Sequence, residues 1–366
     1  MTEQTPAPVR LRPEIASLPA YRQGKPAADG GYKLSSNENP FDPLPGVLAA
    51  LRGADEINRY PEAGSQAVRA ALAERFGVGI DEVHVGAGSV ALLSQFINAA
   101  ASNGDEVVYA WRSFEAYPGL VTVAGASSVR VPLREDGGHD LVAMAQRVTD
   151  STRVVIVCSP NNPTGVVVTR TEFERFMDAV PSDLLVLLDE AYIEFVRDSD
   201  AVDGRELLGR YPNLVILRTF SKAWGLAGLR LGYAIGPAHV LDAARAAAIP
   251  LSVTGQAQAA GVAALAHEAQ LFERVDHLVT RRDAVLAGLR AAGLTVPEAQ
   301  GNFVWLGLGD RSSEAAEVFE RHGIVARVFA DEGVRVSIGE AESVDELLRA
   351  GEEIVQNLRG SAQSAR

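Results

Sequence analysis

Short apolar runs that alternate with longer amphipathic segments are the feature of this sequence that most restricts its fold. The runs lie at residues 82–85, 106–109, 154–158, 184–188, 214–217 and 231–235. Helical periodicity separates them, for example over residues 90–100 and 170–179. Strands that are apolar on both faces and alternate with helices are typical of a mostly parallel sheet covered by helices. We therefore predict an α/β fold for the centre of the chain.

The two ends of the chain differ from this centre. Residues 1–30 are rich in proline and polar side chains and lack a sustained period, so we expect an extended arm. Residues 243–292 are rich in alanine and charged side chains, which suits long helices. In residues 334–338, Arg335 and Ser337 share the polar face of a strand that should be half buried. The predicted limits are an arm at 1–30, a small α+β domain at 31–55 and 245–366, and a large domain at 56–244.

Composition excludes several classes of protein. The chain has 34 Lys and Arg against 47 Asp and Glu, a formal net charge of −13, whereas proteins that bind nucleic acids need clustered cations. Its one cysteine, Cys158, excludes an internal disulfide framework. No run of about 18 apolar residues is present, and the first residues lack the apolar core of a signal peptide. We expect a cytoplasmic protein without a nucleic-acid partner, a membrane partner or a metal site.

Small residues follow the first apolar run, at the strand end where ligands of open α/β sheets bind. Backbone N–H groups of residues 86–89, directly before a predicted helix, are suited to holding a phosphate, although an ordinary tight turn has the same composition. With Ala91 the spacing also fits a dinucleotide fingerprint. That alternative requires an acidic residue at the carboxyl end of the next strand, whereas the acidic residues 105–106 lie at its amino end. A nicotinamide cofactor is therefore disfavoured.

Polar side chains also follow three other apolar runs. A carboxylate such as Asp189, at the end of a buried strand, needs a cationic partner, and a pyridinium nitrogen would be one. Helix capping is the alternative for Asp189, and taken singly Asn162 fits a turn, Tyr192 fits core packing and Lys222 fits a surface position. Together with a phosphate cradle, this set matches what pyridoxal phosphate requires.

The chain resembles a known family through several motifs. They are residues 37–40 (NENP), 58–61 (NRYP), 159–165 (SPNNPTG), 189–192 (DEAY) and 221–232 (SKAWGLAGLRLG). Over about residues 11–348 the chain resembles the fold-type-I pyridoxal-phosphate aminotransferases, in particular the histidinol-phosphate and aromatic aminotransferase group.

This resemblance implies a role for each matching residue. Lys222 would bind the cofactor covalently, Asp189 would pair with its ring nitrogen, and Tyr192 and Asn162 would hold its phenolic oxygen. The residues implied in phosphate binding are Gly88, Ser89, Thr219, Ser221, Arg230 and, from a second subunit, Tyr60. A homodimer with shared active sites follows. Arg335 would bind the acidic group of the amino acid or 2-oxo acid substrate, because a planar guanidinium can bind a carboxylate bidentately.

The segment at residues 111–118 (WRSFEAYP) resembles the aromatic amino-acid branch of the group. Phe114 would stack on the cofactor ring, and together with Tyr21 it would line an apolar pocket for phenylalanine or tyrosine. We therefore expect amino-group transfer between these amino acids and 2-oxoglutarate. A histidinol-phosphate aminotransferase is the alternative, since it shares every catalytic residue. A related decarboxylase also stays open, while a regulatory module without turnover is disfavoured because no basic helix-turn-helix segment is present.

Overall fold

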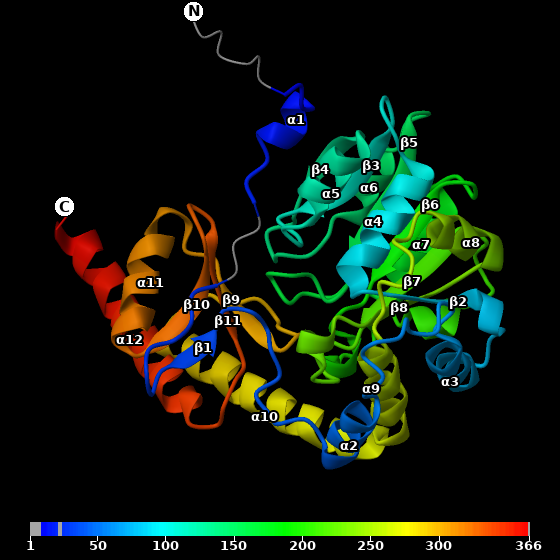
Figure 1. Cartoon of the computed structure of the whole chain (residues 1–366). Coiled ribbons are helices and arrows are strands. Elements are labelled where there is room, and N and C mark those ends of the chain that lie inside the picture. Colours follow the sequence, from blue (N-terminus) through cyan, green and yellow to red (C-terminus); the bar gives the residue numbers. More distant parts are fainter. Residues whose placement is uncertain (1–8, 21–23, 365–366) are drawn as a thin grey trace, which may run out of the picture.

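The computed structural model describes residues 9–20 and 24–364, which fold around two β-sheets (Figure 1). The larger sheet has seven strands in the order β2-β8-β7-β6-β5-β3-β4, and the smaller has four in the order β1-β10-β11-β9. In Figure 1 the larger sheet lies on the right and the smaller on the left, with the long helix α10 (Glu268–Ala292) below them. The predicted α/β fold is confirmed. No helix in the described part of the chain is long and apolar enough to cross a membrane.

The larger sheet is mostly parallel, as predicted. Its strands are β2 (Val83–Gly86), β3 (Glu106–Trp111), β4 (Ser127–Pro132), β5 (Thr152–Cys158), β6 (Leu185–Asp189), β7 (Leu214–Thr219) and β8 (Gly232–Ile235). β8 runs antiparallel to its neighbours β7 and β2, and the remaining pairs are parallel. The sequence did not predict β4, because this edge strand leaves most of its side chains partly or fully exposed and lacks an apolar run.

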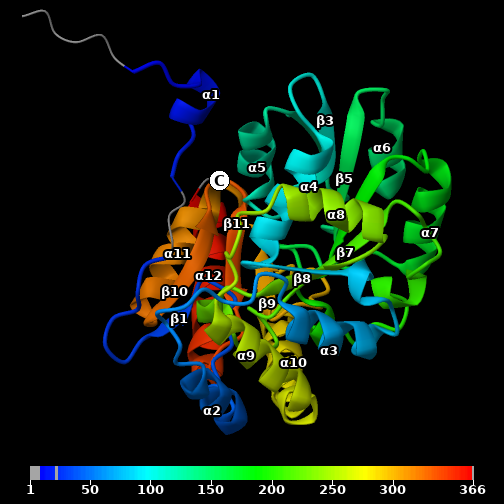
Figure 2. The same ribbon diagram turned by 45° about the vertical axis from the view of Figure 1, so that its right-hand side comes forward.

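Helices cover both faces of this sheet, which explains its apolar strands. One face carries α4 (Ser89–Ala100), α5 (Tyr117–Ala124) and α8 (Ala238–Ala246), and the other carries α6 (Leu141–Gln146) and α7 (Arg170–Ala179), seen at the right of Figure 2. Successive residues of a strand point to opposite faces. Accordingly Val154 and Ile156 of β5 pack in the first apolar layer, while Val155 and Val157 pack in the second.

The smaller sheet combines segments from both ends of the chain. Its strands are β1 (Tyr32–Leu34), β9 (Phe303–Leu306), β10 (Ile324–Phe329) and β11 (Gly333–Ser337), and α11 (Ser312–Arg321) and α12 (Ser343–Ser364) lie beside them. β1 pairs in parallel with β10. The apolar cluster of this sheet continues along α10 to β2 and β8 of the larger sheet. The two sheets are therefore joined by one core, and the domain limits given above stay a prediction.

β11 is more deeply buried than its alternating sequence predicts. All its residues are buried, including Arg335, which is 7% exposed, and Ser337, which is 2% exposed. The expectation of a half-buried strand is wrong, because the polar face meets other parts of the protein instead of solvent. Arg335 bonds to Asn162, and the Ser337 hydroxyl donates a 2.8 Å hydrogen bond to Oδ1 of Asn37.

The N-terminal arm is not wholly extended, which corrects the prediction for residues 1–30. It contains a short helix, α1 (Pro13–Ala16). The Arg12 guanidinium donates to the carbonyl oxygens of Val123 and Thr122 at 3.1 and 3.2 Å, so this part of the arm lies against α5. The remaining elements are α2 (Pro45–Gly53), α3 (Gln66–Phe76), α9 (Gly255–Ala266) and the 3₁₀ turns Ile80–Glu82, Ile193–Phe195, Gly204–Leu207, Ala227–Leu229 and Gly309–Arg311.

Candidate active site

The carboxyl ends of β5, β6 and β7 bring polar side chains together next to the smaller sheet. These strands are neighbours in parallel register, with Cys158 opposite Asp189 and Asp189 opposite Leu217. The segments that follow them carry Asn162, Tyr192 and Lys222. Arg335 arrives from β11 and donates from Nη1 to Oδ1 of Asn162 at 2.5 Å. The candidate site therefore lies where the strand ends of the larger sheet meet the smaller sheet.

Asp189 is a buried carboxylate that uses one of its two oxygens in a hydrogen bond. Its Oδ2 accepts a 2.7 Å hydrogen bond from the Tyr117 hydroxyl, while Oδ1 is buried and has no hydrogen-bond partner among the residues that the structure describes. Burial raises the pKa of Asp189 to about 6, although the Tyr117 bond opposes this shift. A cation placed beside Oδ1 would satisfy the oxygen and favour the charged carboxylate.

The amine of Lys222 has a pKa far below that of an ordinary lysine. Its Nζ donates to the Ser36 carbonyl oxygen at 3.0 Å and lies 5.9 Å from the centre of the Tyr192 ring. Burial, and after it the positive charge of Arg335, lower the pKa of Lys222 to about 7. Near neutral pH a large share of these amines is therefore unprotonated and nucleophilic.

Tyr192 keeps its hydroxyl proton over the physiological pH range. Burial raises the pKa of Tyr192 to about 12, and its hydroxyl oxygen accepts a 3.0 Å hydrogen bond from Nδ2 of Asn37. The ring packs edge-on against Phe303, with 4.9 Å between centroids. Asn37 thus connects Tyr192 to the segment that precedes α2. Sequence reasoning placed Asn37 in a motif but assigned it no role.

The turn after β5 is fixed by Asn161, which sequence reasoning also missed. Its Nδ2 donates to the Thr164 hydroxyl at 2.9 Å and to the Arg112 carbonyl oxygen at 3.1 Å. Its Oδ1 accepts from the Ser113 hydroxyl at 2.7 Å and lies 3.1 Å from Nε2 of His139. This buried amide therefore ties the turn that carries Asn162 to the segment that leads into Phe114.

The predicted phosphate residues of this chain gather at the start of α4. Gly88 is the N-cap of α4 with φ 86°, and a Cβ there would lie 2.6 Å from Nη2 of Arg230. Nη1 of Arg230 donates to the Ser221 hydroxyl at 3.3 Å, and the Ser221 amide donates to Oγ1 of Thr219 at 3.0 Å. With Ser89 as the first helical residue, this cradle combines helix N–H groups, hydroxyls and a guanidinium, the donors that suit a phosphate.

Two predicted residues lie outside this arrangement. The Tyr60 side chain is 86% exposed, and Tyr60 makes no hydrogen bond or ring contact within the described part of this chain. Tyr21 lies outside the described residues. Phe114 is present at the site, where its ring packs edge-on against Tyr117 at 5.6 Å and 88°.

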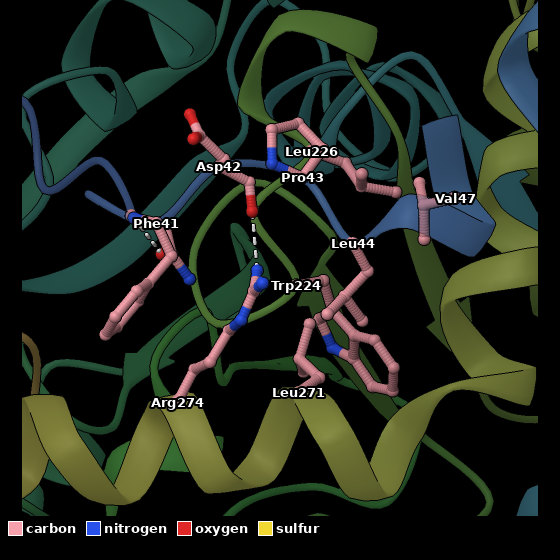
Figure 3. Close-up of a pocket in the computed structure, with 11 residues that line it drawn as sticks. Phe41, Asp42, Pro43, Leu44, Val47, Trp224, Leu226, Leu271 and Arg274 are labelled. Atoms are coloured by element: carbon pink, nitrogen blue, oxygen red, sulfur yellow. Dashed lines mark hydrogen bonds between the residues drawn. The ribbon is translucent and has the colours of Figure 1, made fainter. Parts of the chain in front are cut away.

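A separate pocket is lined in part by the loop that follows Lys222 (Figure 3). It is lined by Asn39, Phe41, Asp42, Pro43, Leu44, Val47, Trp224, Gly225, Leu226, Leu271 and Arg274. Nδ2 of Asn39 donates to the Ala223 carbonyl oxygen at 3.0 Å, and Arg274 donates to the Asp42 carbonyl oxygen at 2.5 Å. None of the predicted site residues in the described part of the chain lines this pocket. Its contacts instead hold the loop after Lys222 against α10 and the segment before α2.

No group of three or more His, Cys, Asp or Glu side chains among residues 9–20 and 24–364 is arranged to hold a metal ion. The site combines a buried acid, an amine with a pKa of about 7, a phenol and two arginines. On a two-sheet α/β fold of this kind, these groups place the chain among the transaminases. The model of the aminotransferase class I and II family matches residues 30–350, and the chain belongs to this family.

Proteins that are similar to this chain in sequence or in structure agree with its membership of the aminotransferase family. An aromatic amino acid aminotransferase of Streptomyces coelicolor is 51% identical over 362 residues, 98% of this chain and 100% of that protein. One of Thermobifida fusca is 52% identical and covers 93% of this chain and 96% of that protein. A histidinol-phosphate aminotransferase of Sinorhizobium meliloti, crystallised with pyridoxal-5'-phosphate, has a TM-score of 0.86 at 28% identity, and the match covers 96% of this chain and 99% of that one.

Proposed function

We propose that this aminotransferase moves amino groups between phenylalanine or tyrosine and 2-oxoglutarate, with pyridoxal phosphate as its cofactor. The observation that carries the cofactor assignment is the buried Oδ1 of Asp189, which no described residue pairs with, because this oxygen needs a cation. The substrate assignment is supported by relatives such as the Streptomyces coelicolor protein, which is 51% identical and named an aromatic amino acid aminotransferase.

The residues present fit pyridoxal phosphate at each of its polar groups. Asp189 would hold a protonated ring nitrogen, Tyr192 and Asn162 would donate to the phenolic oxygen, and the cradle at Gly88 and Arg230 would bind the phosphate. When bound, the cofactor supplies a carbonyl group that condenses with amines and a ring that accepts the electron pair left on the substrate Cα.

The side chains of the protein would then bind the charged groups and transfer the protons. Lys222, whose pKa is about 7, is suited to accept the Cα proton of the substrate and to return it at the next step. Asp189 stays ionised beside a cation, because an opposite charge favours the charged form of a carboxyl group. Arg335, held by Asn162 and by the Ser35 carbonyl oxygen, orients the acidic group of the substrate.

The aromatic side chain of the substrate would be bound by an apolar wall that includes Phe114 and, as predicted from the sequence, Tyr21. Transfer of an aromatic side chain from water to such a wall contributes roughly 1.5–3 kcal/mol. Histidinol phosphate is the second candidate, since the Sinorhizobium meliloti enzyme with that name has a closely similar fold. Its imidazole requires polar partners that Phe114 does not provide.

Assays with phenylalanine, tyrosine and histidinol phosphate, each with 2-oxoglutarate, test this proposal. We expect kcat/KM for phenylalanine or tyrosine to exceed that for histidinol phosphate. A higher value for histidinol phosphate would overturn the substrate assignment. Borohydride reduction followed by peptide mapping should place the cofactor on Lys222, and label on another lysine would overturn the cofactor site.

A homodimer is part of the proposal. Several large apolar side chains are exposed on neighbouring loops: Ile57 (84%), Tyr60 (86%), Ile249 (77%) and Leu251 (37%). Gln256 and Gln258 of α9 donate to the carbonyl oxygens of Ala54 and Glu62 at 2.8 and 2.9 Å, which fixes the loop that carries Tyr60. A second copy would cover these side chains and receive Tyr60 at its phosphate cradle.

Measurement of the molar mass by light scattering tests the dimer, and a monomer at micromolar concentration would contradict it. Tyr60→Phe should weaken cofactor binding without changing the molar mass.

A cytoplasmic location is the last part of the proposal. It is supported by the single cysteine, Cys158, which is buried and unpaired.

A further inference from the structure

Arg335 has a second arginine beside it on the smaller sheet. Arg327 of β10 is its antiparallel register partner, so the two side chains lie on the same face of the sheet. Both guanidinium groups lie 6.0 Å from the centre of the Phe329 ring. Two adjacent guanidinium groups would together attract a dianion more strongly than a monoanion.

Glu115 offsets the charge of this second arginine. Nη2 of Arg327 donates to both carboxylate oxygens of Glu115, at 2.7 and 2.8 Å. The side chains are only 25% and 27% exposed, so water screens this ion pair incompletely. Glu115 directly follows Phe114 in sequence and reaches Arg327 from the larger sheet. The negative charge is thus supplied by the segment that forms the wall of the substrate pocket.

We propose that Glu115 is a specificity-determining residue that sets the net charge of the anion subsite at Arg335 to suit a carboxylate. With Arg327 neutralised, the subsite presents about one positive charge. An amino-acid carboxylate carries one negative charge, whereas a phosphate monoester carries roughly −1.5 to −2 near pH 7. The single positive charge of the subsite therefore balances a bound carboxylate, whereas a bound phosphate monoester would keep an excess of negative charge. This inference rests on the proposed function, since it explains how the site separates its two candidate substrates.

A carboxylate in another part of the fold provides a matched control. Glu174 of α7 accepts from Nε of Arg170 at 3.1 Å and from Nη1 of Arg210 at 2.5 Å, and its side chain is 27% exposed, as that of Glu115 is. α7 covers one face of the larger sheet and packs in an apolar cluster with the strands of that sheet. Loss of Glu174 therefore tests the removal of a paired carboxylate, while loss of Glu115 tests the charge beside Arg335.

The test compares Glu115→Gln and Glu174→Gln with the unmodified holoenzyme. Gln at position 115 keeps the shape of the side chain and can still accept from Arg327. Single-turnover reactions with phenylalanine and with histidinol phosphate give kcat/KM for each substrate. The ratio of the two kcat/KM values is independent of any effect of the mutation that changes both values equally. In Glu115→Gln the ratio should shift about tenfold toward histidinol phosphate, as expected for one unit charge removed at an intermediate dielectric constant. In Glu174→Gln it should stay within about twofold of the unmodified value, because no charge beside Arg335 changes.

A binding measurement makes the test independent of turnover. Inorganic phosphate should inhibit Glu115→Gln more strongly than the unmodified holoenzyme, and Glu174→Gln should resemble the latter. An unchanged substrate ratio and unchanged phosphate inhibition in Glu115→Gln would overturn the inference, as would an equal shift in Glu174→Gln. Absence of phenylalanine turnover in the unmodified enzyme would instead overturn the proposed function, while the phosphate measurement would still report on Glu115.

Discussion

The hydroxyl of Tyr117 donates a 2.7 Å hydrogen bond to Oδ2 of Asp189, and both residues are buried. Burial and the neighbouring carboxylate raise the pKa of Tyr117 well above its usual value, so the hydroxyl keeps its proton and stays a donor. The same ring packs edge-on against Phe114. Tyr117 therefore connects the residue predicted to stack on the cofactor with the residue predicted to carry its counter-charge.

Tyr117→Phe should lower transamination roughly ten- to hundredfold, because a hydrogen bond to a charged group contributes about 1.5–3 kcal/mol. Without this donor the pKa of Asp189 should rise further, since the Tyr117 bond lowers it. The measurements are the single-turnover rate and the dissociation constant of pyridoxal phosphate, which should increase. Tyr109→Phe is the control: Tyr109 lies in the same aromatic cluster, and its buried hydroxyl has no hydrogen-bond partner within residues 9–20 and 24–364. If both variants behave alike, Tyr117 acts only through packing.

Asp189→Asn should reduce transamination by orders of magnitude while the protein still binds pyridoxal phosphate. An amide cannot supply the negative charge that keeps a ring nitrogen protonated. The adjacent Glu190 is the comparison, because it is equally buried but pairs with Arg218 at 2.9 Å and accepts from the Gly204 amide. Glu190→Gln should lower the melting temperature and leave the turnover of the folded enzyme near normal. A near-normal rate in Asp189→Asn would contradict the role of Asp189.

The amine of Lys222 in the cofactor-free enzyme should titrate near pH 7. Its pKa of about 7 lies below the ordinary value of 10.5, so protonation blocks the nucleophile only at lower pH. The rate of reconstitution with pyridoxal phosphate should therefore rise through about pH 7 and level off by about pH 8. A rate that keeps rising to pH 9 and beyond would indicate an ordinary lysine.

The same shift has a consequence for stability, with a sign that can be checked. Between about pH 7 and 10.5 the unfolded chain holds a proton on Lys222 that the folded chain has released. Stability rises with pH wherever the unfolded state binds more protons. The contribution of Lys222 to stability should therefore increase with pH over this interval. Denaturant unfolding of the cofactor-free protein and of Lys222→Met should show a steeper rise in the former.

The strand-end residues could be predicted because they depend on local sequence order. Asp189 and Lys222 follow apolar runs that form central strands, and parallel strands end at the same edge. The pairing of Glu115 with Arg327 could not be predicted, since it joins positions 212 residues apart. The alternation of polar and apolar residues in β11 predicted correctly which face of the strand carries Arg335. It did not predict that Arg335 is buried, because the sequence does not show which other parts of the protein pack against that face.

Arg335→Lys should raise KM for phenylalanine strongly, with a smaller fall in kcat. Nη1 of Arg335 donates to Asn162 at 2.5 Å and Nη2 donates to the Ser35 carbonyl oxygen at 2.7 Å, so the guanidinium is held in one orientation. A lysine has a single charged nitrogen and cannot keep both bonds while binding a carboxylate bidentately. Loss of one charged hydrogen bond corresponds to about a ten- to hundredfold rise in KM.

Arg281→Lys is a suitable control for this measurement. Arg281 of α10 donates to the Gly339 carbonyl oxygen at 2.8 Å, and it has no hydrogen bond or ring contact with those predicted site residues that the structure describes. Its replacement should leave both kinetic constants unchanged, because it removes a guanidinium near the smaller sheet without altering the anion subsite. An unchanged KM in Arg335→Lys, with the protein folded and the cofactor bound, would show that the acidic group of the substrate binds elsewhere. The burial of Arg335 would then serve only to hold Asn162 against the smaller sheet.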